Sequence, residues 1–239
     1  RLADPKYIEG RRHAGFSFRS TDVGVVLDLM IHDIDVVLSL VRSPLQHVDA
    51  LGAAVVGKHE DVASARLTFA SGAIAQLTAS RVSYQNERSM HVFTARRFAA
   101  IDFAARQATL VEPSDAVLGR TLDLSATPPE AIGQTGAQIF TDHLVKSSPT
   151  ADEVNAIEQE IIDFAKAIAA GSPPQVTGAD GRDAVAVAER ILESIAQHQW
   201  DGRRDGRIGP AALAVPTIVA PAVEPWTEDD TVIWRRKAG

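Results

Sequence analysis

The pattern of apolar and polar positions predicts one buried helix early in the chain. Residues 22–41 are apolar on nearly every side and contain no proline, and no glycine follows Gly24. This is typical of a helix in the core of a water-soluble protein. Arg42-Ser43-Pro44 ends the helix, because the residue before a proline disfavours helical angles. Residues 1–21 are basic, and we expect them to be irregular.

The next part of the chain alternates between apolar and polar residues with a period of two. A turn at Ser71-Gly72 joins two such segments into a hairpin. The pattern predicts strands at residues 47–56, 61–69, 73–82, 88–95, 98–103 and 108–112. We expect an α+β fold with an open, predominantly antiparallel meander that helices cover on one face. The second face carries small polar residues, and the sequence alone favours its exposure to solvent.

Two further helices are predicted after the sheet. Residues 114–148 are irregular, with one short strand. Thr150-Ala-Asp-Glu153 is a capping-box signature, and apolar residues follow it at helical spacing as far as Gly171. A second amphipathic helix spans about residues 181–198, and we expect both helices to cover the sheet. Residues 1–200 then form one domain, and residues 201–239 an extended C-terminal tail.

Composition narrows the classes of function. The formal net charge of −7 argues against general affinity for nucleic acid, which needs clustered Lys and Arg. The absence of cysteine excludes disulfides and thiolate metal sites. A membrane span at residues 22–41 is disfavoured, because each charge at its centre would cost about 2.5–3.5 kcal/mol. We therefore expect a cytoplasmic protein that has no membrane or nucleic-acid partner.

Ionisable residues inside the first helix are the main candidates for chemistry. At about 100° per residue, Asp28, His32 and Asp35 share one stripe, whereas Asp33 points elsewhere and is expected to be solvated or capping. The Asp28 carboxylate can orient the His32 imidazole, whose second nitrogen then takes a proton as a general base. Asp35 is expected to contact the substrate along the same wall. The alternative is that His32 and the carboxylate only satisfy each other's hydrogen-bonding groups in the core and have no catalytic role.

The dipeptide His32-Asp33 also permits a remote alternative, a metal-dependent phosphohydrolase. Such a site needs several His and Asp ligands that converge from different helices. The other histidines are scattered through predicted loops and strands, so we predict no metal site. Convergence of the ligands in space is the test of this alternative.

No motif for a dinucleotide is found in the chain. Neither G-x-G-x-x-G nor a Walker-type lysine loop occurs, so we expect this polypeptide alone to bind no cofactor. The chain begins at Arg1 without an initiator Met, and its first residues read as the middle of a longer protein.

Several motifs together resemble the C-terminal domain of Gfo/Idh/MocA oxidoreductases. They are the Asp28 and His32 pair, the His-Asp-Ile-Asp helix, the open sheet, and the helix unit from Ile161 to Gly178, and the resemblance covers roughly residues 5–198. It implies the C-terminal fold of glyceraldehyde-3-phosphate dehydrogenase, with a preceding Rossmann domain for NAD or NADP and an E-K-P lysine, both absent from this chain. His32 would take a hydroxyl proton while a hydride leaves the adjacent carbon, and Asp28 would orient or polarise it.

Further segments resemble a bacterial branch of the family that acts on nucleotide sugars. The implied substrate is a sugar or UDP-sugar, and the narrowest expectation is UDP-N-acetylglucosamine oxidised at C3 for lipid A synthesis. Arg12, Arg19 and Arg81 would then bind the diphosphate, although a salt bridge is the alternative for each. The segments are Tyr7-Ile-Glu9, Arg12, Phe16, Arg19-Ser-Thr-Asp22, residues 25–41 and Leu77-Thr-Ala-Ser80-Arg81.

The resemblance also implies pairing of the open sheet face between subunits, in a homodimer or homotetramer. Two hypotheses stay open at this point. One is the substrate and oligomerisation domain of a sugar dehydrogenase, catalytic only when joined to its Rossmann half. The other is a non-catalytic binding or oligomerisation module that lacks the cofactor.

Overall fold

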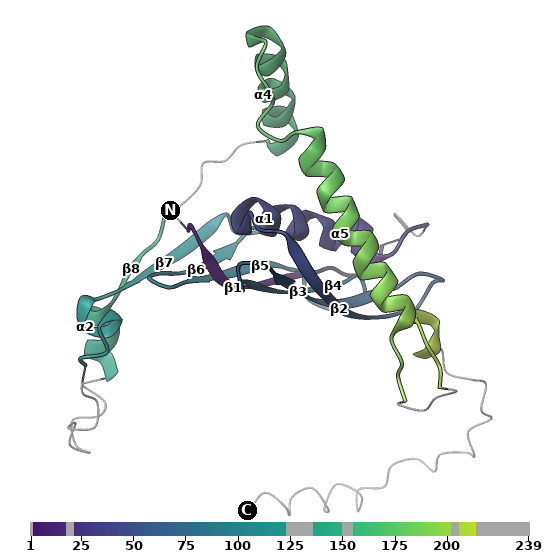
Figure 1. Ribbon diagram of the computed structural model, residues 1–239, viewed down its shortest axis with the longest axis horizontal. Helices are drawn as coiled ribbons and strands as arrows, with labels where there is room; N and C mark the ends of the chain where they lie inside the picture. The colour runs from purple at the N-terminus through teal and green to yellow at the C-terminus, as the bar shows by residue number, and fades with distance from the viewer. Residues whose placement is uncertain (1, 18–21, 123–135, 150–154, 202–205, 214–239) are drawn as a thin grey trace, which may run out of the picture.

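The protein is built on one eight-stranded sheet (Figure 1). The computed structural model describes residues 2–17, 22–122, 136–149, 155–201 and 206–213. The strand order is β2-β3-β4-β1-β5-β6-β7-β8, in which β1 runs parallel to β4 and every other neighbouring pair is antiparallel. The strands are β1 (Pro5–His13), β2 (Leu45–Ala53), β3 (Val62–Phe69), β4 (Ile74–Ser80), β5 (Glu87–Thr94), β6 (Phe98–Asp102), β7 (Gln107–Pro113) and β8 (Leu144–Ser147).

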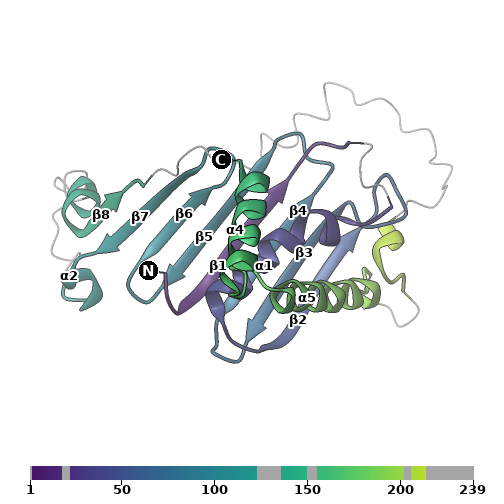
Figure 2. The same cartoon turned by 90° about the horizontal axis from the view of Figure 1, so that it is seen from above.

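Helices cover one face of this sheet. A π-helical turn, η1 (Val26–Met30), continues into α1 (Ile31–Val41). The turn contacts β4 and α1 contacts β1, while α5 (Gly178–Gln197) lies beside α1 and packs on β2 (Figure 2). The expected α+β fold, an open and mainly antiparallel sheet with helices on one face, is confirmed. The remaining helices are α2 (Asp115–Leu118), η3 (Ile139–His143), α4 (Ala156–Ala170) and η4 (Pro210–Leu213).

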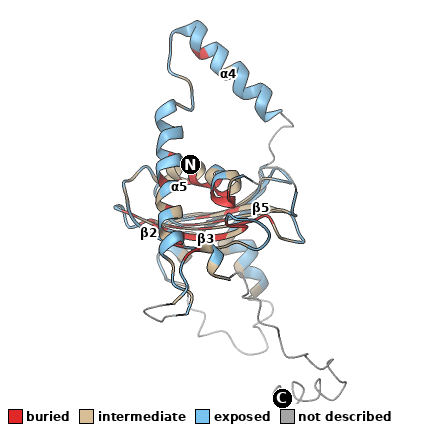
Figure 3. Ribbon diagram, turned by 90° about the vertical axis from the view of Figure 1, so that its right-hand side faces the viewer, coloured by how far each residue is buried: buried red, intermediate tan, exposed pale blue. Residues whose placement is uncertain are grey.

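The core lies between the sheet and these helices, as the buried layer in Figure 3 shows. Alternate residues of β3 face the helices and are at most 1% exposed: Ala63, Ala65, Leu67 and Phe69. Buried residues from η1, α1 and α5 close the core from above: Val26, Met30, Ile34, Val37, Ile191 and Ile195. Apolar burial of this kind is the main stabilising contribution to the fold.

The prediction that residues 1–21 are irregular was wrong for β1. This strand lies at the centre of the sheet between β4 and β5, so these two strands are not neighbours and the meander is interrupted. The polar composition of β1 gave no strand signal in the sequence, because Glu9 and Arg11 point to the open face while Ile8 and Gly10 are buried on the other side.

The prediction that both C-terminal helices cover the sheet was wrong for α4. Helix α5 packs on α1 and β2, but α4 stands away from the sheet (Figure 1). The space over β1 to β4 is already taken by α1 and α5. The predicted capping box at 150–153 falls outside the described residues, and the observed N-cap of α4 is Asn155, whose side chain accepts a hydrogen bond from the Glu158 N–H. A capping box missed in the sequence, Thr177 with Asp180, starts α5 at Gly178.

The first part of the predicted tail returns to the sheet. The Ala54 N–H donates to the carbonyl of Pro210 at 2.9 Å, and the Trp200 indole N–H donates to the carbonyl of Gly209 at 3.0 Å. Residues 214–239 lie outside the described part of the chain. Among the helices that the structure describes, none has the length and apolar character needed to span a bilayer.

Candidate functional site

Glu60 fixes the start of the helix that carries Asp28 and His32. The Val25 N–H donates to the Glu60 carbonyl at 3.0 Å, and the Val26 N–H donates to Glu60 Oε1 at 3.2 Å. Two of the free N–H groups at the helix start are thereby satisfied. A Cβ atom on Gly24 would lie 1.9 Å from Glu60 Oε1, so the contact requires glycine at this position. The sequence analysis missed Glu60, because nothing in the dipeptide Glu60-Asp61 signals burial.

The helix does not begin with the α-helical geometry assumed from its sequence. The Ile31 N–H donates to the carbonyl of Val26, five residues earlier, so Asp28 lies in a π-helical turn and His32 in the first α-helical turn. The Asp28 carboxylate and the His32 imidazole are not hydrogen-bonded to each other in the structure. The predicted i, i+4 contact depends on a uniform helix, and the π turn alters that spacing. Turns of this kind are frequent at functional sites.

The exposure of the two side chains suits a ligand site. His32 is exposed and Asp28 is half-buried, so the imidazole is not sealed in the interior. A bound molecule can therefore reach it from the helix-covered side of the sheet. The catalytic roles of Asp28 and His32 stay predictions.

Asp33 is the anchor of this helix on the sheet. It is 1% exposed, and its two carboxylate oxygens accept hydrogen bonds from the Arg12 guanidinium at 2.7 and 3.1 Å. The prediction that Asp33 is solvated or capping was wrong, because Arg12 of β1 compensates its charge in the interior. For Arg12 the structure shows the salt-bridge alternative. Its contact with a diphosphate stays a prediction.

Arg81 lies in a second buried ion pair. It is 5% exposed, pairs with Asp61, and donates to the Val23 carbonyl at 2.8 Å just before the helix. Burial favours the neutral form of the Asp61 carboxyl, but the N–H of Val56 and the guanidinium favour its charged form, and together they hold the pKa of Asp61 below its ordinary value. In this geometry Arg81 ties β4 to the helix start, and its predicted role toward a substrate stays a prediction.

The two remaining predicted site residues have different outcomes. Arg19 lies outside the described residues. Asp35 is half-buried and lines a hollow of about 1000 Å³ between α1 and the start of α5. Asp28 and His32 are not among the residues that line this hollow, although His32 lies one turn before Asp35 on the same helix.

Side chains cap the starts of the two helices that cover the sheet. A pyrophosphate binds at a free helix N-terminus that follows a glycine-rich loop. Here the Glu60 carboxylate caps the helix that follows β1, and Thr177 with Asp180 caps α5. Within the described residues, no three or more His, Asp or Glu side chains are grouped so that they could hold a metal ion. The phosphohydrolase alternative therefore gains no support from this part of the chain.

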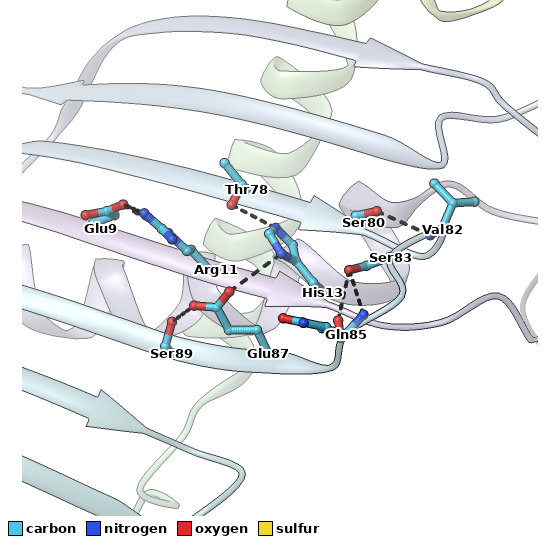
Figure 4. Close-up of polar contacts among 10 residues, drawn as sticks. All are labelled: Glu9, Arg11, His13, Thr78, Ser80, Val82, Ser83, Gln85, Glu87 and Ser89. Atoms are coloured by element: carbon cyan, nitrogen blue, oxygen red, sulfur yellow. Dashed lines mark hydrogen bonds and ion pairs between the residues drawn. The ribbon is translucent and has the colours of Figure 1, made fainter. Parts of the chain in front are cut away.

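The open face of the sheet is divided into an apolar row and a polar region. Ile74, Tyr7, Phe93 and Phe98 lie side by side on four neighbouring strands, and the rings of Phe93 and Phe98 have centroids 4.6 Å apart. Figure 4 shows the polar region around His13, which contacts Thr78 at 3.2 Å and Glu87 at 3.7 Å.

Comparison with known proteins relates the chain to an oxidoreductase family. Residues 4–97 match the family model for the GFO/IDH/MocA C-terminal domain. The UDP-N-acetylglucosamine 3-dehydrogenase of Acidithiobacillus ferrooxidans is 35% identical over 195 residues, which are 80% of this chain and 55% of that protein. Its solved structure gives a TM-score of 0.67 at 30% identity over 81% of this chain and 55% of the other.

A more distant structure shares the fold. Levoglucosan dehydrogenase in complex with NADH gives a TM-score of 0.62 at 16% identity, and the match covers 82% of this chain and 57% of that one. The chain thus spans about half the length of the relatives that it matches.

Proposed function

Because the chain carries a GFO/IDH/MocA C-terminal domain, we propose that it is the substrate domain of an NAD(P)-dependent oxidoreductase. The proposed reaction is oxidation of a hydroxyl of a sugar or nucleotide sugar, or its reverse. UDP-N-acetylglucosamine, oxidised at C3, is the narrowest candidate, and the 35% identity to the A. ferrooxidans dehydrogenase supports it.

The exposed His32 on a helix whose position is fixed from two sides is the observation that carries this proposal. Glu60 holds the start of the helix, and the Arg12 and Asp33 pair holds its first α-helical turn on the sheet. A proton acceptor has to be held in place while its substrate is oriented. Both anchors leave His32 open to a ligand.

The proposed chemistry of this chain is proton transfer and substrate positioning. Oxidation of a carbinol removes a proton from oxygen and a hydride from the adjacent carbon. A ring nitrogen of His32 accepts the proton, and Asp28 orients the imidazole or polarises the hydroxyl. Asp35 hydrogen-bonds a neighbouring hydroxyl. A nicotinamide dinucleotide held by other residues would accept the hydride.

The diphosphate of a nucleotide sugar would need cationic partners. Arg12, Arg19 and Arg81 are proposed for this role from the sequence. Arg12 already binds Asp33, and Arg81 already binds Asp61. Each guanidinium would therefore have to contact its carboxylate and the ligand at the same time. Arg19→Ala is therefore the most informative variant, and the expected effect is a raised KM for the UDP-sugar at unchanged kcat.

The test uses the chain joined to a nucleotide-binding domain. Turnover of a panel of UDP-sugars is followed by nicotinamide absorbance, and cofactor affinity is measured by titration. His32→Ala is expected to abolish turnover and to leave NAD(P) affinity unchanged, while His59→Ala, a change at an exposed loop histidine, leaves both unchanged. An active His32→Ala variant contradicts the proposal.

The second hypothesis is a binding or oligomerisation module without cofactor. The coding sequence upstream of Arg1 separates the two hypotheses, because the catalytic one requires G-x-G-x-x-G and E-K-P there or on a partner protein.

We also propose that the open sheet face pairs two copies of the chain, alone or within a homotetramer. The aromatic row at Tyr7, Phe93 and Phe98 supplies the apolar centre of such an interface. The proposed face lies opposite α1, so pairing there leaves the region of His32 accessible.

A further inference from the structure

Arg88 is an exposed arginine on the helix-covered face of the sheet. It lies directly opposite Arg12 in the register of β1 and β5, and residues paired in this way point to the same face. Arg12 binds Asp33 of α1, so this face is the one that carries the helix. Met90, two residues further along β5, is buried on the same face. The side chain of Arg88 is therefore presented on the side of the sheet where α1 lies.

The charge of Arg88 has no partner in the part of the chain that the structure describes. Neither an ion pair nor a hydrogen bond engages its guanidinium there. The two carboxylate oxygens of Asp33 bind Arg12, and Glu87 points to the open face, where it contacts His13 at 3.7 Å (Figure 4). Like charges directly opposite each other on two strands are destabilising. This position of the sheet thus keeps one uncompensated positive charge.

The strand holds Arg88 at the margin of the helix-covered area. Its backbone pairs with β1 on one side, and on the other its carbonyl accepts a hydrogen bond from the Phe103 N–H at 2.8 Å. The turn η1 and the helices α1 and α5 pack on β4, β1 and β2, whereas β5 is the next strand beyond β1 (Figure 2). The exposed guanidinium is therefore presented from a fixed backbone beside α1, where a ligand can reach it.

Arg88 and His32 both neighbour the ion pair of Arg12 with Asp33. His32 precedes Asp33 on α1, so the two side chains leave the helix in directions about 100° apart. Arg88 is one strand spacing, about 5 Å, from Arg12. A substrate whose hydroxyl lies at His32 can thus place a second, anionic group at Arg88. In a nucleotide sugar, the diphosphate is joined to the same ring that carries the hydroxyl.

We propose that Arg88 is a specificity-determining residue that binds the diphosphate of a nucleotide sugar whose hydroxyl lies at His32. The inference rests on the proposed function. A guanidinium binds two phosphate oxygens through parallel, charge-assisted hydrogen bonds. Arg12 and Arg81 already hold buried carboxylates, whereas Arg88 presents its donors to solvent. A diphosphate at Arg88 would supply the negative charge that the described residues do not.

The test uses the chain joined to a nucleotide-binding domain, with UDP as the probe in calorimetry. Arg88→Gln is expected to weaken UDP binding about tenfold or more, because one charge-assisted contact is lost. Arg88→Lys should recover part of this loss, since it restores the charge without the planar fork. Arg96→Gln is the matched control at an exposed turn beyond the other end of β5, and it should bind UDP with unchanged affinity.

Three results overturn the proposal. Undiminished affinity of Arg88→Gln for UDP removes the diphosphate contact. An equal loss in Arg96→Gln assigns the effect to net charge. Weaker binding of glucuronate, but not of UDP, by Arg88→Gln assigns the cation to a sugar carboxylate.

Thermal unfolding separates binding from a structural role. Without ligand, the Tm of Arg88→Gln should equal or exceed that of the unaltered protein, because the charge opposite Arg12 is removed. UDP should raise the Tm of the unaltered protein more than that of the variant. A lower Tm for Arg88→Gln without ligand, with an equal rise in UDP, assigns Arg88 to the fold and overturns the proposal.

Failure of this inference can be told apart from failure of the proposed function. His32→Ala is expected to lose turnover and to keep its affinity for UDP, while Arg88→Gln is expected to raise the KM for UDP-N-acetylglucosamine at unchanged kcat. Binding of UDP that depends on Arg88 without turnover of any UDP-sugar contradicts the proposed function alone. Turnover of UDP-sugars with a KM that Arg88→Gln does not change contradicts the role of Arg88 alone.

Discussion

Arg12 and Asp33 join the central strand β1 to helix α1 through a bidentate ion pair with N···O distances of 2.7 and 3.1 Å. The preceding residue, Arg11, points to the open face and pairs there with Glu9 at 2.6 Å. Two consecutive arginines of β1 thus form ion pairs on opposite faces of the sheet, and only the pair of Arg12 with Asp33 is buried. The buried pair sets the rotation of α1, because a guanidinium and a carboxylate fit each other in few orientations.

Loss of Arg12 is expected to destabilise the fold strongly. Arg12→Met leaves the buried Asp33 carboxylate without its cation and should lower the free energy of unfolding by about 3 kcal/mol. Arg11→Met, a matched change at an exposed pair, should lower it by less than about 0.5 kcal/mol. Urea denaturation at fixed protein concentration measures both. The double variant Arg12→Met with Asp33→Leu should lose less than Arg12→Met does, and equal losses would show that the unpaired charge is not the cause.

Gly24 is expected to tolerate no side chain. Gly24→Ala places a methyl group 1.9 Å from Glu60 Oε1, so either the carboxylate or the helix start must move. The expected loss of unfolding free energy is about 1–3 kcal/mol. Gly15→Ala is the control, because the nearest atom to its new methyl group is the Ser83 carbonyl oxygen at 3.7 Å. Thermal unfolding of both variants decides the point, and equal Tm values would refute the close contact.

The helices and the sheet could be predicted because their signals are local. The alternation in β3 and the apolar run of residues 25–41 are dictated by burial against one layer. Strand β1 escaped prediction since a central strand with one polar face and only Ile8 as a large buried residue has almost no apolar signal. The apolar face of α4 was predicted from the spacing of its residues, but this spacing does not show which surface packs against that face.

The candidate site was predictable in its residue types and not in its geometry. The spacing of Asp28 and His32 assumes a uniform α-helix, whereas the turn at Val26–Met30 is π-helical. Burial of Asp33 depends on Arg12, which lies 21 residues away in the chain. Glu60 contributes through a contact with the backbone of Val26 across 34 residues. Contacts of this kind depend on the tertiary fold, so a local pattern does not contain them.

Asp61 is expected to make stability depend on pH in the acid range. Its pKa is lowered in the folded state, so the unfolded chain binds its proton at a higher pH than the folded protein does. The carboxylate therefore stabilises the fold at a pH above the unfolded value of about 3.9, and this stabilisation is lost as the pH falls through the folded pKa. Asp61→Asn should be less stable at pH 7 and should have a flatter profile below pH 5. A profile parallel to that of the unaltered chain, in urea unfolding at each pH, would contradict this.

Pairing through the open sheet face is expected to depend on Phe93. Phe93 and its neighbour Tyr7 are 38% and 37% exposed, and together with Phe98 they form a ring cluster on this face. Phe93→Glu puts a charge at the centre of the proposed interface, where its desolvation would have no compensating partner. Sedimentation of this variant should show a monomer, while the unaltered chain sediments as a dimer or tetramer. Val56→Glu, which places the same charge at a 60% exposed loop position, should assemble normally. A monomeric unaltered chain, or a Phe93→Glu variant that assembles with undiminished affinity, would exclude this face as the interface.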